Sequence, residues 1–496
     1  MTSFIQAAAG KEPCDIFFVN ARVFCPFTGE WEDNTSFGGV KDGRVAGFGT
    51  YAAEQTVDLR GGNASSPGLI DAHVHIESSL LTPSEYARAV IPHGTTTVFA
   101  DPHEIANVAG TAGGAEVYVA GAFPNSAGYP ADASVLCAAT PPLDRGGGAV
   151  LSCRDLSAFV GEEGIAGIGE VMNVPGVLAE DPDLLCKIGL SAVVDGHAPP
   201  LLSGENLCAY IAAGIQSDHE CTTAAEAAEK LQRGMYIMLR EGSTEKNLGA
   251  LAAVVTPATA PPRCCFATDD RHADMLAADG HIDDCIRRAV AAGIEPETAY
   301  RMATLSAAGR FGLNDRGALS PGRRADFCVM DDHGPPCTVT DTYIQGVRWT
   351  DPGYRRPEIL SVPFSCAPLT EESIAIHGAG KARVVGLVPG QILTRELSEE
   401  VDGGVILPDP SRDLLKLVVC DRYRRGGGCG VGIVNGFGIR DGAIAASVAH
   451  DSHNLIAVGS DDASIIRAAE RVIAADGGMA AVAGNTSAFL PLECGG

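Results

Sequence analysis

Aromatic residues, long apolar runs and positive charge are all scarce in this sequence. Aromatic residues make up 6% of the 496 residues, although hydrophobic residues together make up 46%. No apolar run reaches the roughly 18 residues that a membrane-spanning helix needs, so we expect neither a membrane segment nor a membrane partner. The composition is that of a globular protein with ample core, and the length predicts more than one domain.

The shortage of basic residues excludes a second class of partner. Lys and Arg number 36 against 62 Asp and Glu, which gives a formal net charge of −26 and a pI of about 4.8. Such a protein would repel a phosphate backbone, so we expect no nucleic acid among its partners. The acidic surface also has the simpler role of keeping the protein soluble, and we attach no specific function to it.

A secretion signal and a paired cysteine motif are missing as well. The N-terminal run MTSFIQAAAGKEP lacks a basic segment followed by an apolar one, so it predicts no signal peptide and a cytoplasmic location. The 16 cysteines are scattered through apolar runs such as LLCKIGL, and none forms a C-x-x-C pair. We therefore interpret the cysteines as buried free thiols and expect no catalytic cysteine.

Strand-like segments flank a long central region. Residues 15–59 consist of short strand-like runs, with Asp42-Gly43 as a hairpin turn signal. Similar runs recur in RRADFCVMDD and CTVTDTYIQGVRW, where Gln345-Gly346 marks another turn. We predict one small β-sandwich domain assembled from residues 1–66 and 325–354.

The central region, residues 67–324, alternates apolar strand-like runs with Ala-rich helical runs. Examples are TTTVFAD followed by AGTAGGAEVYVAGA, and CCFATDD followed by HIDDCIRRAVAAG. About eight such alternations predict an α/β fold, a (β/α)8 TIM-like barrel. Residues 355–496 predict a separate α+β domain with one helix, DDASIIRAAERVIAADGG, and with tight turns in the Gly-rich run GGGCGVGIVNGFG.

Polar side chains follow most of the predicted barrel strands, and PGLIDAHVHIESS is the clearest case. Alternation along a strand directs residues i and i+2 to the same side, so His73 and His75 can reach one metal ion. A lone His-x-His pair often occurs by chance. This pair follows Asp71 at the end of a short strand and opens a predicted barrel, which favours a metal site.

Further candidates lie at later strand ends. Glu170 ends the run IAGIGE, where a buried carboxylate is costly unless it is paired or bound to a metal. Any single histidine after a strand is more often structural, but clusters at successive strand ends make coincidence improbable. The candidates after later strands are His197, His219, Glu220, Asp269 and Asp270.

This donor set indicates a binuclear metal site. Mixed nitrogen and oxygen ligands suit Mn, Fe or Zn better than Mg or Ca. Two cations that share a bridging water would lower the pKa of that water and produce a hydroxide nucleophile. Asp269 could both bind a metal and take a proton from the water, so it is the candidate general base.

Two weaker groups leave two interpretations open. Asp101, His103 and Glu104 in FADPHEIANV could orient ligands or contact a substrate, or they could form a simple turn after a strand. Similarly, a substrate contact or a charged helix start would explain the run MLREGST, which contains Arg240, Glu241 and Ser243.

The runs HVHIESSLLTPSEYARAV, GEVMNVPGVL, SDHECTTAAEA and FATDDRHADML resemble segments of the adenine deaminases of the amidohydrolase superfamily. The run FGIRDGAIAASVAHDSHNLIAVG is similar to the extra domain of that family. The resemblance covers about residues 15–490. Many superfamily members bridge their metals with a carboxylated lysine, whereas Glu170 stands at that place here, in agreement with the adenine deaminases.

The resemblance implies hydrolysis of adenine to hypoxanthine and ammonia in purine salvage, by a homo-oligomer such as a dimer. It also implies a pair of Mn²⁺ or Fe²⁺ ions per chain and Asp269 as the proton shuttle. Glu220 and Glu77 are our candidates for protonating the purine ring. The implied metal ligands are His73, His75, Glu170, His197, His219 and Asp269. Our substrate-binding candidates are His103, Glu104, Glu241, Ser243, Asp270, His450 and His453.

Other interpretations stay open at this point. The same architecture could act on another purine or on a cyclic amidine or amide, because barrels of this kind host many substrates. A catalytically inactive barrel that serves as a scaffold is the second alternative, and loss of metal ligands would be its signature. Family members usually continue past the run AFLPLECGG, so we expect residues 355–496 to be a shortened form of the C-terminal domain.

Overall fold

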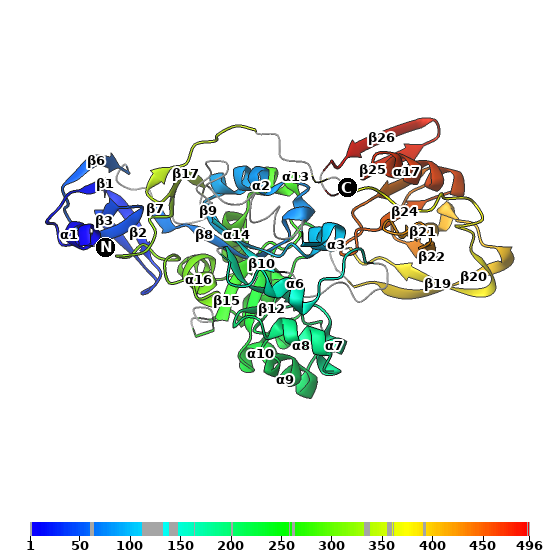
Figure 1. Cartoon of the computed structure of the whole chain (residues 1–496), viewed down its shortest axis with the longest axis horizontal. Helices are drawn as coiled ribbons and strands as arrows, with labels where there is room; N and C mark the ends of the chain where they lie inside the picture. The colour runs from blue at the N-terminus through cyan, green and yellow to red at the C-terminus, as the bar shows by residue number, and fades with distance from the viewer. Residues whose placement is uncertain are drawn as a thin grey trace. The chain divides into compact units, whose positions relative to one another are not determined.

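The computed structural model shows a chain that divides into two compact units (Figure 1). The barrel unit comprises Met1–Pro102, Val117–Thr140 and Ser152–Arg355, and the C-terminal unit comprises His103–Glu116, Pro141–Leu151 and Arg356–Gly496. The structure describes residues 2–59, 64–111, 132–137, 147–162, 164–199, 202–256, 258–259, 263–331, 338–354, 360, 362–389, 393–493 and 495.

Parallel strands form a closed barrel in the barrel unit. Within the described residues, they pair as a five-stranded sheet, β12-β11-β10-β9-β8, and a three-stranded sheet, β13-β14-β15. The Gln216 amide donates to the Val194 carbonyl over 3.3 Å and the Asp269 amide to the His73 carbonyl over 3.0 Å, so both seams are joined. The strands are β8 (Leu69–Val74), β9 (Thr95–Ala100), β10 (Asp132–Cys137), β11 (Ile165–Val171), β12 (Val194–Gly196), β13 (Ser217–Asp218), β14 (Tyr236–Arg240) and β15 (Cys264–Ala267).

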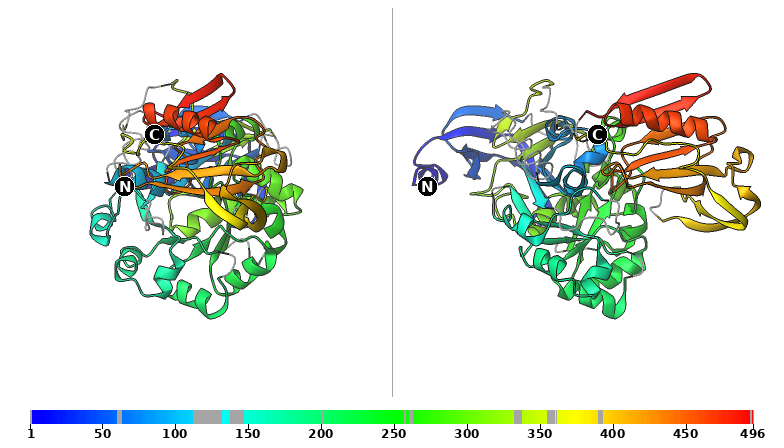
Figure 2. Two further views of the ribbon diagram at one scale, coloured as in Figure 1. Left: turned by 90° about the vertical axis from the view of Figure 1, so that its right-hand side faces the viewer. Right: turned by 45° about the vertical axis from the view of Figure 1, so that its right-hand side comes forward.

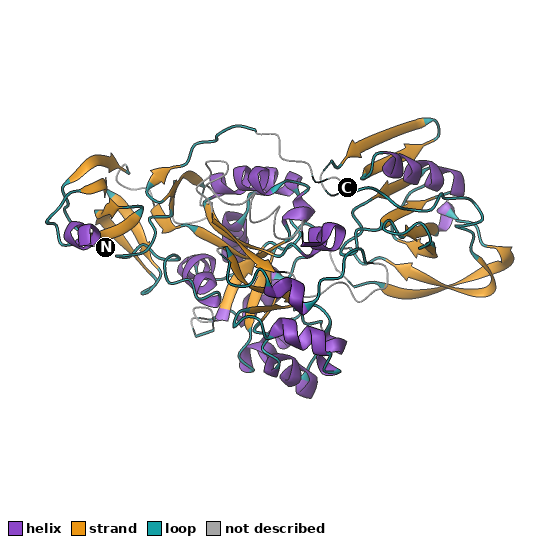
Figure 3. Ribbon diagram, in the orientation of Figure 1, coloured by secondary structure: helices purple, strands orange, loops and turns teal. Residues whose placement is uncertain are grey.

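Helices surround these strands (Figure 3). In α14 (Ile282–Ala291), the buried positions Ile282, Cys285, Ile286 and Ala289 recur every three or four residues, which is the spacing of one helix face. The other helical segments are α2 (Pro83–Val90), α6 (Cys153–Ser157), α7 (Val174–Leu178), α8 (Pro182–Ile188), α9 (Gly204–Ala212), α10 (Ala224–Gln232), α11 (Leu248–Leu251), α13 (Ala273–Asp279), α15 (Pro296–Arg301), the π-helix Met302–Ser306 and α16 (Ala307–Arg310).

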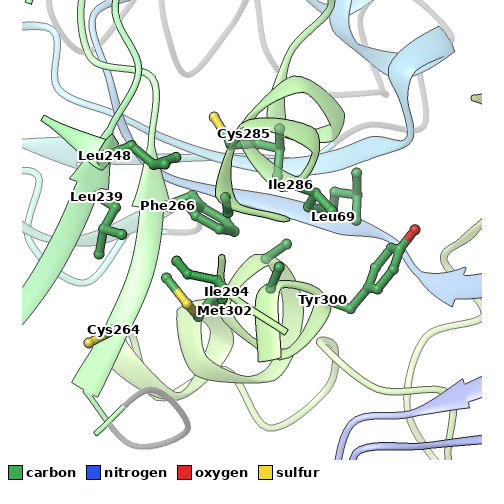
Figure 4. Packing of buried hydrophobic residues seen from close by; sticks show 14 of the residues in the cluster. Leu69, Leu239, Leu248, Cys264, Phe266, Cys285, Ile286, Ile294, Tyr300 and Met302 are labelled. Atoms are coloured by element: carbon green, nitrogen blue, oxygen red, sulfur yellow. The ribbon is translucent and has the colours of Figure 1, made fainter. Parts of the chain in front are cut away.

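A hydrophobic cluster joins one side of the barrel to its outer helices (Figure 4). Leu69, Leu239 and Phe266 come from β8, β14 and β15, and they pack with Ile286 of α14 and Tyr300 of α15. Burying an apolar side chain of this size stabilises the fold by about 1.5–3 kcal/mol relative to an exposed one. This cluster therefore fixes the strands whose ends hold the polar residues described below.

Strands from both flanks of the barrel share one sheet. Its order is β18-β17-β16-β7-β2-β3, and β16 (Phe327–Met330) pairs antiparallel with β7 (Ala64–Pro67). A second sheet has the order β5-β4-β1-β6. The remaining bounds are β1 (Cys14–Val19), β2 (Ala21–Cys25), β3 (Glu30–Thr35), β4 (Phe37–Lys41), β5 (Arg44–Phe48), β6 (Ala53–Asp58), β17 (Val339–Ile344), β18 (Val347–Arg348) and, before them, the helix α1 (Thr2–Ala8).

Both predicted hairpin turns are formed. Asp42 and Gly43 have φ values of 52° and 70°, and Gln345 and Gly346 have φ values of 51° and 80°. Two successive residues with positive φ make the tight turn that matches the twist of a hairpin, and glycine takes this conformation without steric cost.

The C-terminal unit is built on one sheet with the order β20-β19-β22-β21-β24-β23-β25-β26 among the described residues. The helix α17 (Asp462–Ala474) packs on this sheet, where it contacts β23, β24 and β25 (Figure 2, red helix). The other elements are α3 (His103–Thr111), β19 (His377–Gly386), β20 (Arg395–Val405), β21 (Leu415–Cys420), β22 (Cys429–Asn435), β23 (Ala443–Ala446), β24 (Leu455–Gly459), β25 (Gly478–Ala483) and β26 (Thr486–Pro491).

Two predictions from the sequence are wrong. The Gly-rich run predicted as tight turns contains the strand β22, because Cys429–Asn435 pairs with both β19 and β21 and so gains ladder hydrogen bonds on two sides. Not all cysteines are free thiols: Cys153 is bonded to Cys186, and Cys420 to Cys429. The fold brings these partners together, and no spacing rule in the sequence reveals the pairing.

Most of the predicted helix AGTAGGAEVYVAGA, from residue 112 onward, lies outside the described residues.

No helix in the described part of the chain is long and apolar enough to cross a membrane.

Candidate metal centre

Two histidines at the end of β8 direct one ring nitrogen each toward the same point. His73 is completely buried and His75 is 2% exposed, and their Nε2 atoms lie 3.1 Å apart. The Nδ1 atom of His73 lies 2.9 Å from Asp195 Oδ2, and that of His75 lies 3.0 Å from the Asp101 carbonyl oxygen. Because both oxygens are acceptors, Nδ1 of each ring keeps its proton, and Nε2 can bind a metal ion once it has lost its own proton.

Asp269 completes a first trio of donors. Its Oδ1 atom lies 3.1 Å from His75 Nε2 and 3.5 Å from His73 Nε2. The residue follows β15 with a φ of 54°, and its amide is tied to the His73 carbonyl. The seam that closes the barrel thus also places the carboxylate of Asp269 against the histidine pair.

Glu170 joins this trio to a second trio, which it forms with His197 and His219. Its Oε1 atom lies 3.3 Å from His75 Nε2, while Oε2 lies 2.8 Å from His197 Nδ1 and 3.2 Å from His219 Nε2. The Glu170 amide donates to Asp101 Oδ2 over 2.7 Å, which fixes the end of β11. One carboxylate therefore faces both groups of histidines, which is the arrangement of a bridging ligand.

The charges of this cluster compensate one another. Burial alone would lower the pKa of His73, but its contacts with Asp195 and Asp269 outweigh burial and raise the pKa to about 10. Burial likewise opposes the charged form of Glu170, yet His197, His219 and His75 hold its pKa well below the usual range. The buried carboxylates thus stay anionic among imidazoles, and divalent cations would take over the neutralising role of the protons.

Arg240 and Glu220 lie beside the two trios. The guanidinium of Arg240 contacts the Glu220 carboxylate, and its Nη1 atom lies 2.6 Å from Asp269 Oδ2. Glu220 Oε1 is 3.6 Å from His219 Nε2 and 3.9 Å from His197 Nδ1. The structure therefore brings Glu220, one of the two candidate proton donors, against the candidate ligands. Glu77, the other one, is half-buried in the 3-10 helix Ile76–Ser79 directly after His75.

Three candidates for substrate contacts lie on loops of the barrel unit. Ser78 donates a hydrogen bond to the carboxylate of Asp270. Ser243 accepts a hydrogen bond from the His272 amide over 2.8 Å, and its own amide donates to the Asp270 carbonyl over 2.8 Å. Glu241 is buried, and burial raises the pKa of its carboxyl. Purine contacts by Glu241, Ser243 and Asp270 stay predictions.

The sequence reasoning missed Asp195. This carboxylate is completely buried, holds the Nδ1 atom of His73 and lies 3.7 Å from Arg310 Nη2. Burial opposes its charged form, but His73 and Arg310 lower its pKa to about 2. A signal was present, because Asp195 precedes His197 by two residues in VVDGH and strand alternation directs both to one side.

The remaining candidates lie together in the C-terminal unit. His103 and Glu104 begin α3, and His450 and His453 lie between β23 and β24. Glu104 Oε1 is 2.6 Å from His450 Nδ1 and 3.0 Å from His453 Nε2.

Comparisons with known proteins establish the family. Residues 65–348 match the family model described as Amidohydrolase family, and residues 391–496 match the model described as Adenine deaminase C-terminal domain. The chain therefore belongs to the amidohydrolases, whose metal-dependent barrel agrees with the strand-end cluster described above.

Three relatives show to which family within the amidohydrolases the chain belongs. The chain is 57% identical over 461 residues to the adenine deaminase of Methanoculleus marisnigri. The aligned region covers 92% of this chain and 87% of that protein. It is 54% identical over 501 residues to the adenine deaminase of Methanoregula boonei, with 100% and 87% covered. Adenine deaminase 2 of Carboxydothermus hydrogenoformans is 42% identical, with 99% and 87% covered. Within the amidohydrolases, this chain is a member of the adenine deaminase family.

Proposed function

We propose that this chain hydrolyses adenine to hypoxanthine and ammonia with a pair of Mn²⁺ or Fe²⁺ ions in the barrel unit. The observation that carries the proposal is the position of Glu170, with one oxygen directed at His75 and the other at His197 and His219. The substrate follows from the family, since fold alone does not choose among the reactions of barrel enzymes.

The residues present fit a binuclear centre. Ligand atoms that share one ion at about 2.0–2.2 Å lie roughly 3–3.5 Å from one another. The separations of 3.1 Å and 3.5 Å between the donors of His73, His75 and Asp269 are of this size. The first ion would be held by His73, His75, Asp269 and Glu170, and the second by Glu170, His197 and His219. When bound, the cations would act as Lewis acids and make water a nucleophile at neutral pH.

Side chains of the barrel unit move the protons. Water adds to C6 of adenine, the adjacent ring nitrogen gains a proton, and the C6–N bond breaks to release ammonia. We assign to Asp269 the transfer of a proton from the water to the departing amine. The assignment is supported by Arg240, which contacts Oδ2 while Oδ1 faces the histidine pair. Glu220 is our candidate for protonating the ring, and Glu77 is the alternative. The residue that gives this proton regains one from the C6 hydroxyl as the carbonyl of hypoxanthine forms.

The rest of the organisation follows the same proposal. We infer a β domain formed by residues 1–66 and 325–354, the catalytic barrel in residues 67–324 and an adenine-deaminase-type domain in residues 355–496. We further infer a cytoplasmic homo-oligomer, such as a dimer, that serves purine salvage.

The test is ammonia release from adenine by the full chain loaded with Mn²⁺, with adenosine as the control substrate. We expect turnover of adenine and none of adenosine. The variant Glu170→Gln should lose turnover, while His377→Gln, a change at an exposed histidine of β19, should keep it. Turnover of another purine in place of adenine would refute the substrate and keep the hydrolase. A chain that binds metal but turns over no purine or cyclic amide would be a scaffold.

A further inference from the structure

A second group of histidines and carboxylates lies wholly within the C-terminal unit. His103 and Glu104 are the first residues of α3, and His450, Asp451 and His453 come from the segment that joins β23 to β24. None of these residues is among the six ligands assigned above to the two barrel ions, so the group needs an explanation of its own.

Each carboxylate of this group lies between two imidazole rings, and the two ring nitrogens of His450 face different carboxylates. Asp451 Oδ1 lies 3.1 Å from His103 Nε2 and 3.0 Å from His450 Nε2. Glu104 Oε1 lies 2.6 Å from His450 Nδ1 and 3.0 Å from His453 Nε2. Donor atoms of His103, Glu104 and Asp451 all lie within 4.8 Å of one another. These separations match those between the histidine nitrogens and carboxylate oxygens of the barrel centre.

The group is closed on one side and open on the other. His103, Glu104 and His453 are 3%, 1% and 8% exposed, whereas the side chains of His450 and Asp451 are 42% and 29% exposed. An ion could enter past the two exposed side chains and be held by the three buried ones. This combination of a buried floor and an accessible rim is what a binding site requires.

Glu104 supplies an independent observation. Among the residues that the structure describes, its buried Oε2 atom has no hydrogen-bond partner. Leaving a buried carboxylate oxygen unsatisfied is costly, and a network of hydrogen bonds alone would not explain it. A cation that takes both oxygens of Glu104, or Oε2 after a small rotation of the side chain, removes this cost.

Further contacts hold the two segments in place. Asn107 lies one helical turn after His103, and its Nδ2 atom donates to the Ser452 carbonyl over 2.7 Å. The Tyr423 hydroxyl donates to the same carbonyl over 2.6 Å. The loop between His450 and His453 is therefore fixed against α3 by groups other than the donors, as in a preorganised site.

We propose that His103, Glu104 and Asp451, together with His453 and one ring nitrogen of His450, bind a further divalent cation in addition to the pair in the barrel. Histidine nitrogens with carboxylate oxygens suit Zn²⁺, Mn²⁺ or Fe²⁺. The ion links the start of α3 to the segment between β23 and β24. This site takes the place of the purine contacts predicted for His103, Glu104, His450 and His453, and it does not depend on the proposed reaction.

The test is the metal content of the full chain after chelation, reloading with Zn²⁺ or Mn²⁺ and removal of free metal. We expect about three ions per chain in the native protein, about two in Glu104→Gln or His450→Gln, and about one in a His73→Ala/Glu170→Ala/His197→Ala/His219→Ala variant, which lacks ligands of both barrel ions. His377→Gln, at an exposed histidine of the same unit, is the matched control. Far-ultraviolet circular dichroism shows whether each variant is folded.

A spectroscopic measurement tests the same site without a determination of the metal content. The variant that lacks the barrel donors, loaded with Co²⁺, should show the visible absorption of an ion bound by histidine and carboxylate. The absorption should disappear when Glu104→Gln is added and persist when His377→Gln is added. Equal metal content in native protein and Glu104→Gln would overturn the proposal. A raised KM for adenine in Glu104→Gln with unchanged metal content would overturn it in favour of a purine contact.

Discussion

Arg240 Nη1 lies 2.6 Å from Asp269 Oδ2, and the arginine is 4% exposed. The same guanidinium contacts Glu220, so a single buried cation separates two carboxylates. Burial raises the pKa of Asp269, but Arg240, His73 and His75 outweigh burial and hold it well below the usual range. The contact therefore keeps Asp269 ionised and orients its second oxygen toward the histidine pair.

Replacing Arg240 should lower turnover more than it changes substrate affinity. In Arg240→Met, Asp269 and Glu220 repel each other, and the proton acceptor loses its orientation. General acid–base groups contribute about 10²–10⁴-fold to a rate, so we expect kcat to fall by at least about 100-fold. Steady-state kinetics at matched metal content measures the effect, with Arg240→Lys as the conservative variant. A change confined to KM would show that Arg240 acts on the substrate instead.

Substitution of Glu170 should remove metal as well as activity. Gln cannot offer two anionic oxygens to His75, His197 and His219, so the shared ligand is lost. We expect Glu170→Gln to bind about one barrel ion fewer and to lose more than about 100-fold in kcat. Elemental analysis and ammonia release are the measurements. Glu170→Asp keeps the charge but shortens the reach, and intermediate values are expected for it. Full metal content in Glu170→Gln would exclude a bridging role.

Asp195 should affect the metal affinity of the barrel centre although it is not itself a metal ligand. Its Oδ2 atom accepts from Nδ1 of His73, which keeps the other ring nitrogen available. Loss of such an outer hydrogen bond typically weakens metal binding about 10–100-fold, and this is the expected effect of Asp195→Asn. Competition with a coloured chelator measures it. Asp351→Asn, in an exposed ion pair with Arg88, is the control that should leave affinity unchanged.

Asp283 should make the free energy of unfolding of the barrel unit depend on pH in the acidic range. Burial opposes its charged form, but His93 and Arg287 lower its pKa to about 2, against about 3.9 in an unfolded chain. Because the folded pKa is the lower one, the carboxylate contributes stability above about pH 4 and loses it as the pH falls toward 2. The contribution is about 2 kcal/mol.

The variant Asp283→Asn tests this directly. It should unfold at a lower temperature than the native protein at pH 7, and the difference should shrink as the pH falls below 4. Scanning calorimetry at several pH values gives both melting temperatures. Asp274→Asn, at an exposed aspartate of α13, serves as the control. A difference that stays constant down to pH 3 would mean that hydrogen bonding, not charge, accounts for the effect.

The sequence was sufficient to predict the barrel and to predict that the polar residues after its strands lie close together. Alternating apolar and Ala-rich runs determine the strand order of a parallel barrel, and strand ends of a barrel meet at one rim, so His73 and Asp269 could be paired across almost 200 residues of chain. The role of Arg240 was not predicted, because nothing in the run MLREGST distinguishes a contact with Glu220 and Asp269 from a charged helix start. The Cys153–Cys186 bond, the strand in Cys429–Asn435 and the cluster around Glu104 likewise depend on neighbours that only the folded chain supplies.

The bridging role proposed for Glu170 also has a consequence for how the metal centre would be assembled. Superfamily members that bridge their metals with a carboxylated lysine must capture carbon dioxide before they can bind the pair. The carboxylate of Glu170 is part of the side chain itself and needs no such modification. Reconstitution of this chain with metal should therefore proceed equally well in degassed buffer and in buffer with added bicarbonate, and the centre should be insensitive to the carbon dioxide supply of the cell.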